Sequence, residues 1–374
     1  MHVVLLKAHL NQGGGLEKYA MRICNAFLQK GNEVTFLTAK PPVGMMQASY
    51  AVFPPRNFLP KFLQIEQFDR EVGRHLAKMN ADIVLGMDRN REQTHIRAGN
   101  GVHAAFLKSR MFSEGKAKYW LCHLNPLHRK ILQIEKAAFE NPRLKKVFVN
   151  SYKVQHELLE YYAIEPGRIE VIHNGVEWKE HEPLFQTFEA DREATLQHFG
   201  LNGNRFHLLF IGNGYKRKGL DVLLKALSLW KFKDFHLSVI GKEKRLRWYQ
   251  WKTKQLQLEN QVRFFGPQKN VIPFYQMADV LVIPSFYDPF ANVTLEGLSL
   301  GLFVISSKEN GGSEVLTEQN GTCIENLTKI ETVLSALDRS LLYRKTKDRA
   351  HRIRSSVAHL DFSLQLSKLI DACG

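Results

Sequence analysis

The sequence has few cysteines and no long apolar run. The cysteines are scattered, without a Cys-x-x-Cys pair or the spacing of a zinc site, at Cys24, Cys122, Cys323 and Cys373. This usage is typical of reduced thiols and favours a cytoplasmic protein. No stretch approaches the roughly 18 apolar residues that span a bilayer. Residues 1–10 are too short for a signal peptide and lack a cleavage-site pattern.

Acidic residues are scarce relative to basic ones. The 374 residues include 52 Lys and Arg against 37 Asp and Glu, a formal net charge of +15. Such a charge favours phosphorylated substrates, anionic membranes or nucleic acid, without deciding between them. Hydrophobic residues make up 44 % and charged residues 24 % of the chain, so it is an ordinary globular protein, long enough for two domains.

The first half of the chain alternates apolar segments with amphipathic ones. A buried strand is predicted at 2–8, then a glycine loop, a helix at 16–30 and a strand at 33–38, which together form a βαβ unit. Further strands are predicted at 82–87, 145–150 and 168–172. Ser151 is predicted to cap a helix that ends at Tyr162.

A second series of the same kind begins near residue 206. Its helix is predicted at 220–230 and its strands at 208–212, 236–241, 262–266, 280–284 and 303–307. The acidic stretch 177–193 between the two series is interpreted as a linker. We therefore predict an α/β protein with two successive parallel-sheet domains and a cleft between them, with boundaries 1–176, 177–350 and a C-terminal helix at 351–374.

Two carboxylates eight positions apart follow the strand at 280–284. Asp288 suits a loop, and Glu296 stands one turn inside a predicted helix. The N–H groups of the loop face the space beyond the strand end and favour anionic or hydroxyl-rich ligands. A solvated loop Asp and a helix Glu favoured by the macrodipole would give the same pattern.

A basic, glycine-containing loop follows the strand at 208–212. Arg217 and Lys218 stand at the carboxyl end of that strand, where α/β folds bind ligands. A planar Arg fork and a Lys point charge together suit a diphosphate, and Gly212 lets the backbone approach it. The loop lacks the Gly-Lys-Ser/Thr ending of a P-loop, which argues against an NTPase. The alternative is a solvated basic turn.

The loop Gly13-Gly14-Gly15 precedes the first helix. Lys18 breaks the G-x-G-x-x-G pattern, so the dinucleotide fingerprint fails. The helix N-terminus can still face an anion, and a simple β-to-α turn is the alternative.

The segment 104–146 contains ten basic residues against three acidic ones, interleaved with Phe112, Trp120, Leu121 and Leu124. Basic and aromatic residues together suit the interface of an anionic bilayer, or a nucleic acid. A helical insertion that covers the core of its own domain is the alternative.

Taken in order, these motifs resemble those of retaining glycosyltransferases with the GT-B fold, of family 4 type. The resemblance covers the acid-x7-Glu pair, the Arg-Lys-Gly loop, the first glycine loop and Gly311-Gly312-Ser313-Glu314. Asp288 stands where Glu is more usual in the family. Chain length, the basic segment and the Gly-Gly-Leu start are similar to members that glucosylate the lipopolysaccharide core, although Tyr19 replaces the acid of that subgroup.

The resemblance implies a role for each candidate residue. Glu296 would bind the ribose of a nucleotide sugar and Asp288 the hydroxyls of the transferred sugar. Arg217 and Lys218 would neutralise the diphosphate. A histidine of the first domain would lie beside the 6-hydroxyl, and His103 is the candidate, with His95 and His123 as alternatives. The other expected donor contacts come from Gly14, Gly15, Gly212, Phe290, Ala291, Asn292, Val293 and Thr294.

The implied activity is transfer of a hexose, glucose in the subgroup, from a donor such as UDP-glucose with retention of configuration. The donor would bind the second domain, the acceptor (a glycan or lipid-linked glycan such as lipopolysaccharide core) the first, and the last helix would cross back to the first. No cofactor or metal is expected, because cations already face the phosphates and no Asp-x-Asp run is present. The segment 104–146 would contact the inner face of the cytoplasmic membrane, and nucleic acid is disfavoured as a partner.

Two alternatives remain open. One is a non-catalytic basic protein that binds anionic lipid or nucleic acid on a decayed GT-B scaffold; the intact Arg217, Lys218 and Glu296 argue against it. The other is a sugar-nucleotide epimerase or a phosphorylase of the same architecture, but neither a pyridoxal-binding lysine motif nor the epimerase pattern is evident.

Overall fold

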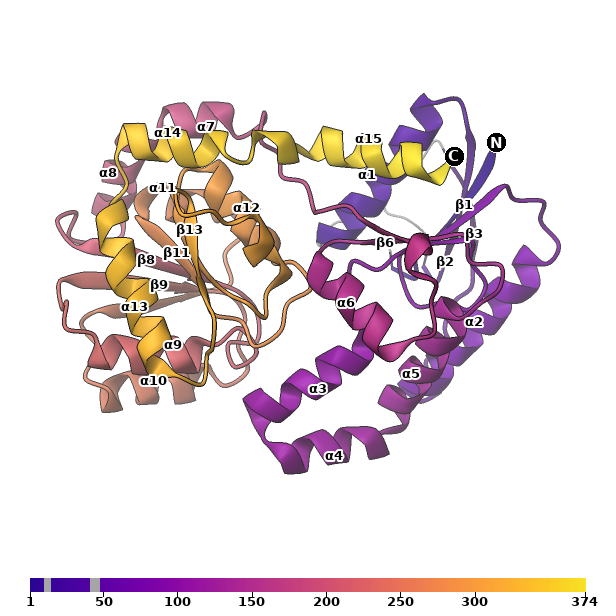
Figure 1. The fold of residues 1–374 in the computed structure, drawn as a ribbon, viewed down its shortest axis with the longest axis horizontal. Helices are drawn as coiled ribbons and strands as arrows, with labels where there is room; N and C mark the ends of the chain where they lie inside the picture. Colours follow the sequence, from indigo (N-terminus) through magenta and orange to yellow (C-terminus); the bar gives the residue numbers. More distant parts are fainter. Residues whose placement is uncertain (10–14, 41–47) are drawn as a thin grey trace. The chain divides into compact units, whose positions relative to one another are not determined.

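The computed structural model describes residues 1–9, 15–40 and 48–374, which form two α/β units (Figure 1). The first unit contains Met1–His173 and Ser363–Gly374, and the second contains Asn174–Phe362. Two successive parallel-sheet domains were predicted, and this class is confirmed. The limits differ in detail, since residues 351–361 belong to the second unit and the last helix begins only at Phe362.

The first unit is built on seven parallel strands in the order β3-β2-β1-β4-β5-β6-β7. They are β1 (His2–Leu6), β2 (Glu33–Thr38), β3 (Ser49–Val52), β4 (Ile83–Gly86), β5 (His95–Arg97), β6 (Lys146–Val149) and β7 (Ile169–Val171). Strand β1 lies between β2 and β4, so the chain reverses its direction across the sheet there.

The helices of the first unit are α1 (Gly15–Gln29), α2 (Lys61–Leu76), α3 (His103–Glu114), α4 (Lys116–Leu124), α5 (Pro126–Phe139), α6 (Tyr152–Tyr161) and α15 (Phe362–Cys373). Ser151 caps α6 as predicted, because its Oγ accepts a hydrogen bond from Val154 N at 3.2 Å. The last helix, α15, packs Leu369 and Ile370 into the core formed by β1 and α1 (Figure 1).

The second unit is built on six parallel strands in the order β10-β9-β8-β11-β12-β13. They are β8 (Phe206–Ile211), β9 (Phe235–Ile240), β10 (Val262–Gly266), β11 (Val280–Ile283), β12 (Phe303–Ser307) and β13 (Gly321–Ile324). Its helices are α7 (Glu182–Gln186), α8 (Phe188–His198), α9 (Leu220–Leu229), α10 (Leu246–Gln255), α11 (Ile272–Met277), α12 (Asn292–Ser299), α13 (Ile330–Ser340) and α14 (Lys347–Ser355).

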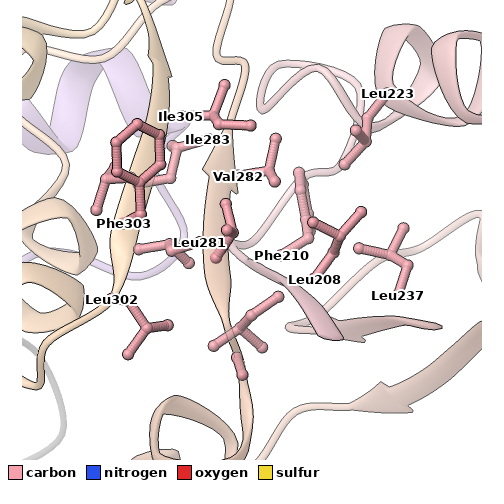
Figure 2. Close-up of a cluster of buried hydrophobic side chains, with 14 of the residues drawn as sticks. Leu208, Phe210, Leu223, Leu237, Leu281, Val282, Ile283, Leu302, Phe303 and Ile305 are labelled. Atoms are coloured by element: carbon pink, nitrogen blue, oxygen red, sulfur yellow. The ribbon is translucent and has the colours of Figure 1, made fainter. Parts of the chain in front are cut away.

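The central strands of this sheet are buried on both faces. Figure 2 shows Leu208 and Phe210 of β8 beside Leu281 and Val282 of β11, and all four side chains are almost inaccessible to solvent. Helices that cover both faces of a parallel sheet explain why these strands read as continuous apolar runs. The core therefore fixes the strand ends from which the candidate site is built.

The predicted linker at 177–193 is wrong. It folds into α7 and the start of α8, and Phe185 and Phe188 pack against Ala350 of α14 in a small buried cluster. The acidic residues of this stretch are partly or fully exposed, whereas these two aromatic side chains are buried. Apolar burial therefore outweighs the polar composition on which the linker prediction was based.

Two further observations concern the cysteines and the membrane. All four cysteines carry free thiols, and Cys24, Cys122 and Cys373 are buried.

Within 1–9, 15–40 and 48–374, no helix is both long enough and apolar enough to cross a bilayer.

Candidate functional site

The candidate site of the second unit lies where its sheet reverses direction. Strand β8 is the neighbour of both β9 and β11. The loops after β8 and β11 therefore start from adjacent strand ends and continue in opposite directions across the sheet. In open α/β sheets such a switch point is the usual ligand-binding position. Arg217 and Lys218 belong to the loop after β8, and Asp288 belongs to the loop after β11.

The structure brings these three predicted residues into direct contact. The Nζ of Lys218 lies 2.5 Å from Oδ2 of Asp288, and Nη1 of Arg217 lies 3.2 Å from the same oxygen. Arg217 Nη1 also donates to the carbonyl of Tyr287 at 2.8 Å. Asp288 and Lys218 are only 7 % and 8 % exposed, whereas Arg217 is half-buried. One carboxylate therefore neutralises part of the charge of two cations.

The charge balance keeps Asp288 ionised. Burial alone would raise its pKa, but the charges of Lys218 and Arg217 outweigh burial and lower the pKa of the carboxyl below its ordinary value. The local cluster of two cations and one anion carries a net positive charge. It is therefore suited to an anionic ligand such as a diphosphate.

Close backbone contacts hold the two loops together. The amide of Phe286 donates to the carbonyl of Arg217 at 2.8 Å. Gly219 has φ +77°, and a Cβ at this position would lie 1.7 Å from the carbonyl oxygen of Pro284. A glycine is therefore required after Lys218. Gly212, another predicted residue, lies beside the Lys218 side chain, and its Cβ would approach Cγ of Lys218 to 3.0 Å.

Asn310 fixes the start of α12, and sequence reasoning missed it. Its Oδ1 accepts from the amides of Ala291 (2.9 Å) and Gly312 (3.1 Å), and its Nδ2 donates to Thr294 Oγ1 (3.3 Å) and Ser306 Oγ (2.9 Å). Asn310 is fully buried. An Asn between a buried strand and a Gly-Gly pair was the available signal, because Asn in such a position often bonds to the backbone two residues later.

The predicted contacts over 290–294 fall at the first turn of α12. The amide of Ala291 is bonded to Asn310, and that of Thr294 donates to the carbonyl of Ala291 at 2.9 Å, so both are already engaged inside the protein. Phe290 is buried, Asn292 is exposed and Val293 is partly exposed. The amides of Asn292 and Val293 stand in a helical turn that supplies no intrahelical partner for them.

Glu296 lies one turn further along α12. Its Oε2 accepts a hydrogen bond from the hydroxyl of Tyr275, a fully buried residue of α11, at 2.7 Å. Tyr275 was not predicted. It stands 21 positions before Glu296, and nothing in the local sequence connects the two residues.

His103 is the first residue of α3 in the first unit and is buried. Its ring Nε2 lies 3.0 Å from Nδ1 of His128, and its amide donates to both oxygens of Glu135. Burial, and then the nearby charge of Arg89, lower the pKa of His103 to about 3, so the ring is neutral at physiological pH. The alternative His95 lies in β5, stacked on Phe148, and burial lowers its pKa to about 4.

The remaining first-unit predictions are placed only in part. Gly15 is the first residue of α1, whereas Gly14 lies outside the described residues, and so does the side chain of His123. Among the residues that the structure does place, no three His, Cys, Asp or Glu side chains gather as metal ligands would.

Two parallel α/β units, with two cations in contact with one carboxylate at the switch point of the second, define a glycosyltransferase of the GT-B class. Two family models match the chain: Glycosyltransferase Family 4 over residues 13–179 and Glycosyl transferases group 1 over residues 191–355. Together they account for most of the chain, and the protein belongs to this family of glycosyltransferases.

Individual relatives support this assignment. The chain is 24 % identical over 334 residues to the lipopolysaccharide glucosyltransferase WaaG of Escherichia coli K12, covering 88 % of this chain and 86 % of the relative. A crystal structure of WaaG superimposes with a TM-score of 0.78 at 22 % identity and covers 99 % of both chains. The structure of HepE from Anabaena in complex with UDP and glucose gives a TM-score of 0.69 at 15 % identity, over 99 % and 98 % of the two chains.

Proposed function

We propose that the protein is a retaining hexosyltransferase that moves glucose from UDP-glucose to a glycan or lipid-linked acceptor such as lipopolysaccharide core. The observation that carries the proposal is the convergence of Arg217 and Lys218 on Asp288 at the switch point of the second unit. The curated name of the WaaG relative supports glucose and lipopolysaccharide, and the UDP complex of HepE supports the uridine donor.

In this proposal the donor diphosphate binds Lys218 and Arg217 in exchange for Asp288. Both cations already face an oxygen anion, and phosphate oxygens are of the same chemical type. Asp288 is then free to accept hydrogen bonds from the hydroxyls of the sugar. Glu296 accepts hydrogen bonds from the ribose hydroxyls, and the first turn of α12 faces the phosphates with its N–H groups.

The chemical step breaks the bond between the anomeric carbon and the diphosphate oxygen. Negative charge grows on the leaving diphosphate as the bond breaks, and fixed cations stabilise that charge in the transition state. The acceptor hydroxyl forms the new bond on the same face of the sugar and gives its proton to the departing phosphate oxygen. Because Lys218 and Arg217 supply the positive charge, we propose that neither a metal nor a cofactor is needed.

We propose that the acceptor binds the first unit near Gly15 and His103. A neutral imidazole at a helix N-terminus can donate one hydrogen bond to a sugar hydroxyl or accept one from it. Nε2 of His103 lies beside His128, so this role requires that contact to be exchanged for the substrate.

We also propose that α3, α4 and α5 contact the inner face of the cytoplasmic membrane. Four apolar side chains of α3 and α4 are between 62 % and 74 % exposed: Phe112, Trp120, Leu121 and Leu124. The sequence around them is strongly basic. Exposed aromatic and aliphatic side chains among basic residues suit the headgroup region of an anionic bilayer. Flotation with vesicles containing anionic lipid, compared with neutral vesicles, tests this contact.

The rival function is a non-catalytic protein on a decayed scaffold. The contacts of Arg217, Lys218 and Asp288 argue against it, since a site without a ligand has no need of two cations turned toward one buried carboxylate. Binding to RNA or acidic lipid without binding to any nucleoside diphosphate would favour the rival.

Thermal unfolding with UDP, GDP, ADP and UDP-glucose tests the proposed function. A ligand at 100 times its Kd that binds only the native state adds roughly 2.7 kcal/mol to the free energy of unfolding, an easily measured shift. We expect UDP and UDP-glucose to raise the melting temperature, and Glu296→Ala and Lys218→Ala to abolish the rise. If none of the four ligands shifts the wild type, the proposed donor site is wrong.

A further inference from the structure

The carboxylate of Glu296 is held from inside the protein. Tyr275 donates its hydroxyl to Oε2 of Glu296 at 2.7 Å, from a position with no exposed surface. Burial, followed by the negative charge of Glu296, raises the pKa of Tyr275 well above its ordinary value. The hydroxyl therefore remains a donor over the whole working pH range.

Tyr275 is itself anchored at its backbone. Its carbonyl accepts from Nζ of Lys345 at 3.2 Å, and that nitrogen lies 4.4 Å from the centre of the Phe188 ring. The amide of Lys345 donates to Oδ1 of Asp279 at 3.1 Å. The backbone of Tyr275 thus has a fixed partner and its side chain is fully buried, so Tyr275 can hold Glu296 rather than follow it.

Recognition of a diol by a carboxylate depends on orientation. The two hydroxyls of a ribose can each donate to a carboxylate only when the plane of its oxygens is turned toward them. A Glu side chain that is free to rotate would lose rotamer entropy on binding. A buried donor that holds one oxygen removes part of that loss before the ligand arrives.

We propose that Tyr275 is a positioning residue for donor recognition, which holds Glu296 so that the site prefers a ribonucleoside diphosphate to its 2′-deoxy form. This inference rests on the proposed function, in which Glu296 binds the donor ribose. Tyr275 touches neither the ribose nor the phosphates and acts through Glu296 alone.

A purely structural role, in which the Tyr275–Glu296 bond only ties α11 to α12, predicts a different result. Loss of such a tie would weaken all ligands of the site equally. A positioning role predicts a larger loss of affinity for UDP, which offers two hydroxyls to Glu296, than for 2′-deoxy-UDP, which offers one. Tyr249 provides a matched control, since it is also buried and also donates to a carboxylate, Oδ2 of Asp221, at 3.2 Å.

The test is calorimetric titration of the full-length protein with UDP and with 2′-deoxy-UDP. We expect Tyr275→Phe to weaken UDP binding about tenfold, as loss of one hydrogen bond to a charged group does, and to weaken 2′-deoxy-UDP binding less, because that ligand offers only its 3′-hydroxyl to Glu296. Tyr249→Phe should keep the wild-type preference. In a Glu296→Gln background, the effect of Tyr275→Phe on UDP binding should disappear.

Equal weakening of both ligands by Tyr275→Phe, or no weakening of either, would overturn the inference. If Tyr275→Phe does not fold, Tyr275→Met replaces it, because it also lacks the hydroxyl that holds Glu296 and must lose the preference as well. Failure of the proposed function gives a separate signature, in which the wild type binds no UDP or Glu296→Gln binds it unchanged.

Discussion

Asp288 has two different contacts in this account, one with cations in the structure and one with the sugar in the proposed reaction. In the structure its carboxylate accepts from Lys218 and Arg217, and in the proposed reaction it contacts the transferred sugar. Asp is one methylene shorter than the Glu usual at this position. The short side chain, itself buried, lies against the buried Lys218, so under the proposed function Asp288 takes the place of the donor phosphate when no donor is bound.

Replacing Asp288 by Asn should separate the two roles. Removal of the internal anion leaves Lys218 and Arg217 without their carboxylate, so we expect UDP to bind roughly three- to tenfold more tightly. The free energy of unfolding without ligand should fall by about 3 kcal/mol, because a buried ammonium loses its partner. Calorimetric titration and chemical denaturation measure the two effects.

A matched control is Asp221→Asn, which removes a carboxylate paired with Lys252 outside the site. It should not tighten UDP binding. If Asp288→Asn binds UDP more weakly than the wild type, Asp288 does not compete with the phosphates.

At the scale of elements, the loop after β8 should tolerate no side chain at Gly219. Its φ is +77°, and an added Cβ would overlap the carbonyl oxygen of Pro284. Gly214 has φ +69° with no atom within 4 Å of the added Cβ. We expect Gly214→Ala to cost about 1 kcal/mol from the left-handed conformation alone, and Gly219→Ala to cost clearly more.

Urea denaturation of the two glycine variants measures this difference, and nucleotide titration follows its effect on the site. Equal losses in the free energy of unfolding for Gly214→Ala and Gly219→Ala would mean that the contact with Pro284 relaxes without displacing the loop.

Strands β8 and β9 carry a pair of buried histidines. His207 and His236 are register partners, their ring centres lie 5.7 Å apart, and burial lowers the pKa of both, that of His236 from 6.5 to about 3. Because the folded pKa is depressed, the stability from the neutral ring is fully present above pH 6.5. It is lost as the pH falls from 6.5 toward 3.

The second unit should therefore lose stability in mild acid. At pH 5 the penalty from His236 alone is about 2 kcal/mol. His236→Leu should flatten the stability profile between pH 6.5 and pH 5, measured by urea denaturation at each pH. An unchanged slope in that variant would contradict the assignment of the acid loss to this histidine.

The sequence predicts the strands that read as continuous apolar runs and misses those that do not. The apolar runs of β8, β9 and β11 were predicted because both faces of these strands are buried. Strands β3, β5 and β13 were missed. β3 and β13 are only partly buried, and β5 contains His95 and Arg97 among its three residues, so none of the three reads as an apolar run.

The same distinction applies to the candidate site, where residues with a local sequence pattern were predicted and residues with only tertiary contacts were missed. Arg217, Lys218, Asp288 and Glu296 were predicted because they belong to local strand-loop-helix patterns. Asn310 and Tyr275 were missed, since their contacts join segments 16 to 21 positions apart that only the fold brings together. Residues that position other residues are therefore hard to recognise from the sequence around them.

At the scale of the whole molecule, the end of the chain completes the first unit. Leu369 of α15 is fully buried among residues of β1 and α1, although it lies more than 300 positions from them in the chain. We expect Leu369→Ala to destabilise the first unit by about 3 kcal/mol.

Thermal unfolding and limited proteolysis of the first unit measure this effect. The control is Leu364→Ala on the same helix, since Leu364 is 47 % exposed and its loss should change stability by less than about 0.5 kcal/mol. Equal effects of the two substitutions would mean that α15 does not support the first unit through its buried face.

The most direct test of the central claim is a proton NMR time course of UDP-glucose turnover with a lipopolysaccharide core glycan as acceptor. The account predicts that glucose appears on the acceptor in the α configuration, without added metal, and that Lys218→Ala abolishes its formation. A β-linked product, or no turnover by a protein that binds UDP and contains an intact site, would contradict the proposal of a retaining glucosyltransferase.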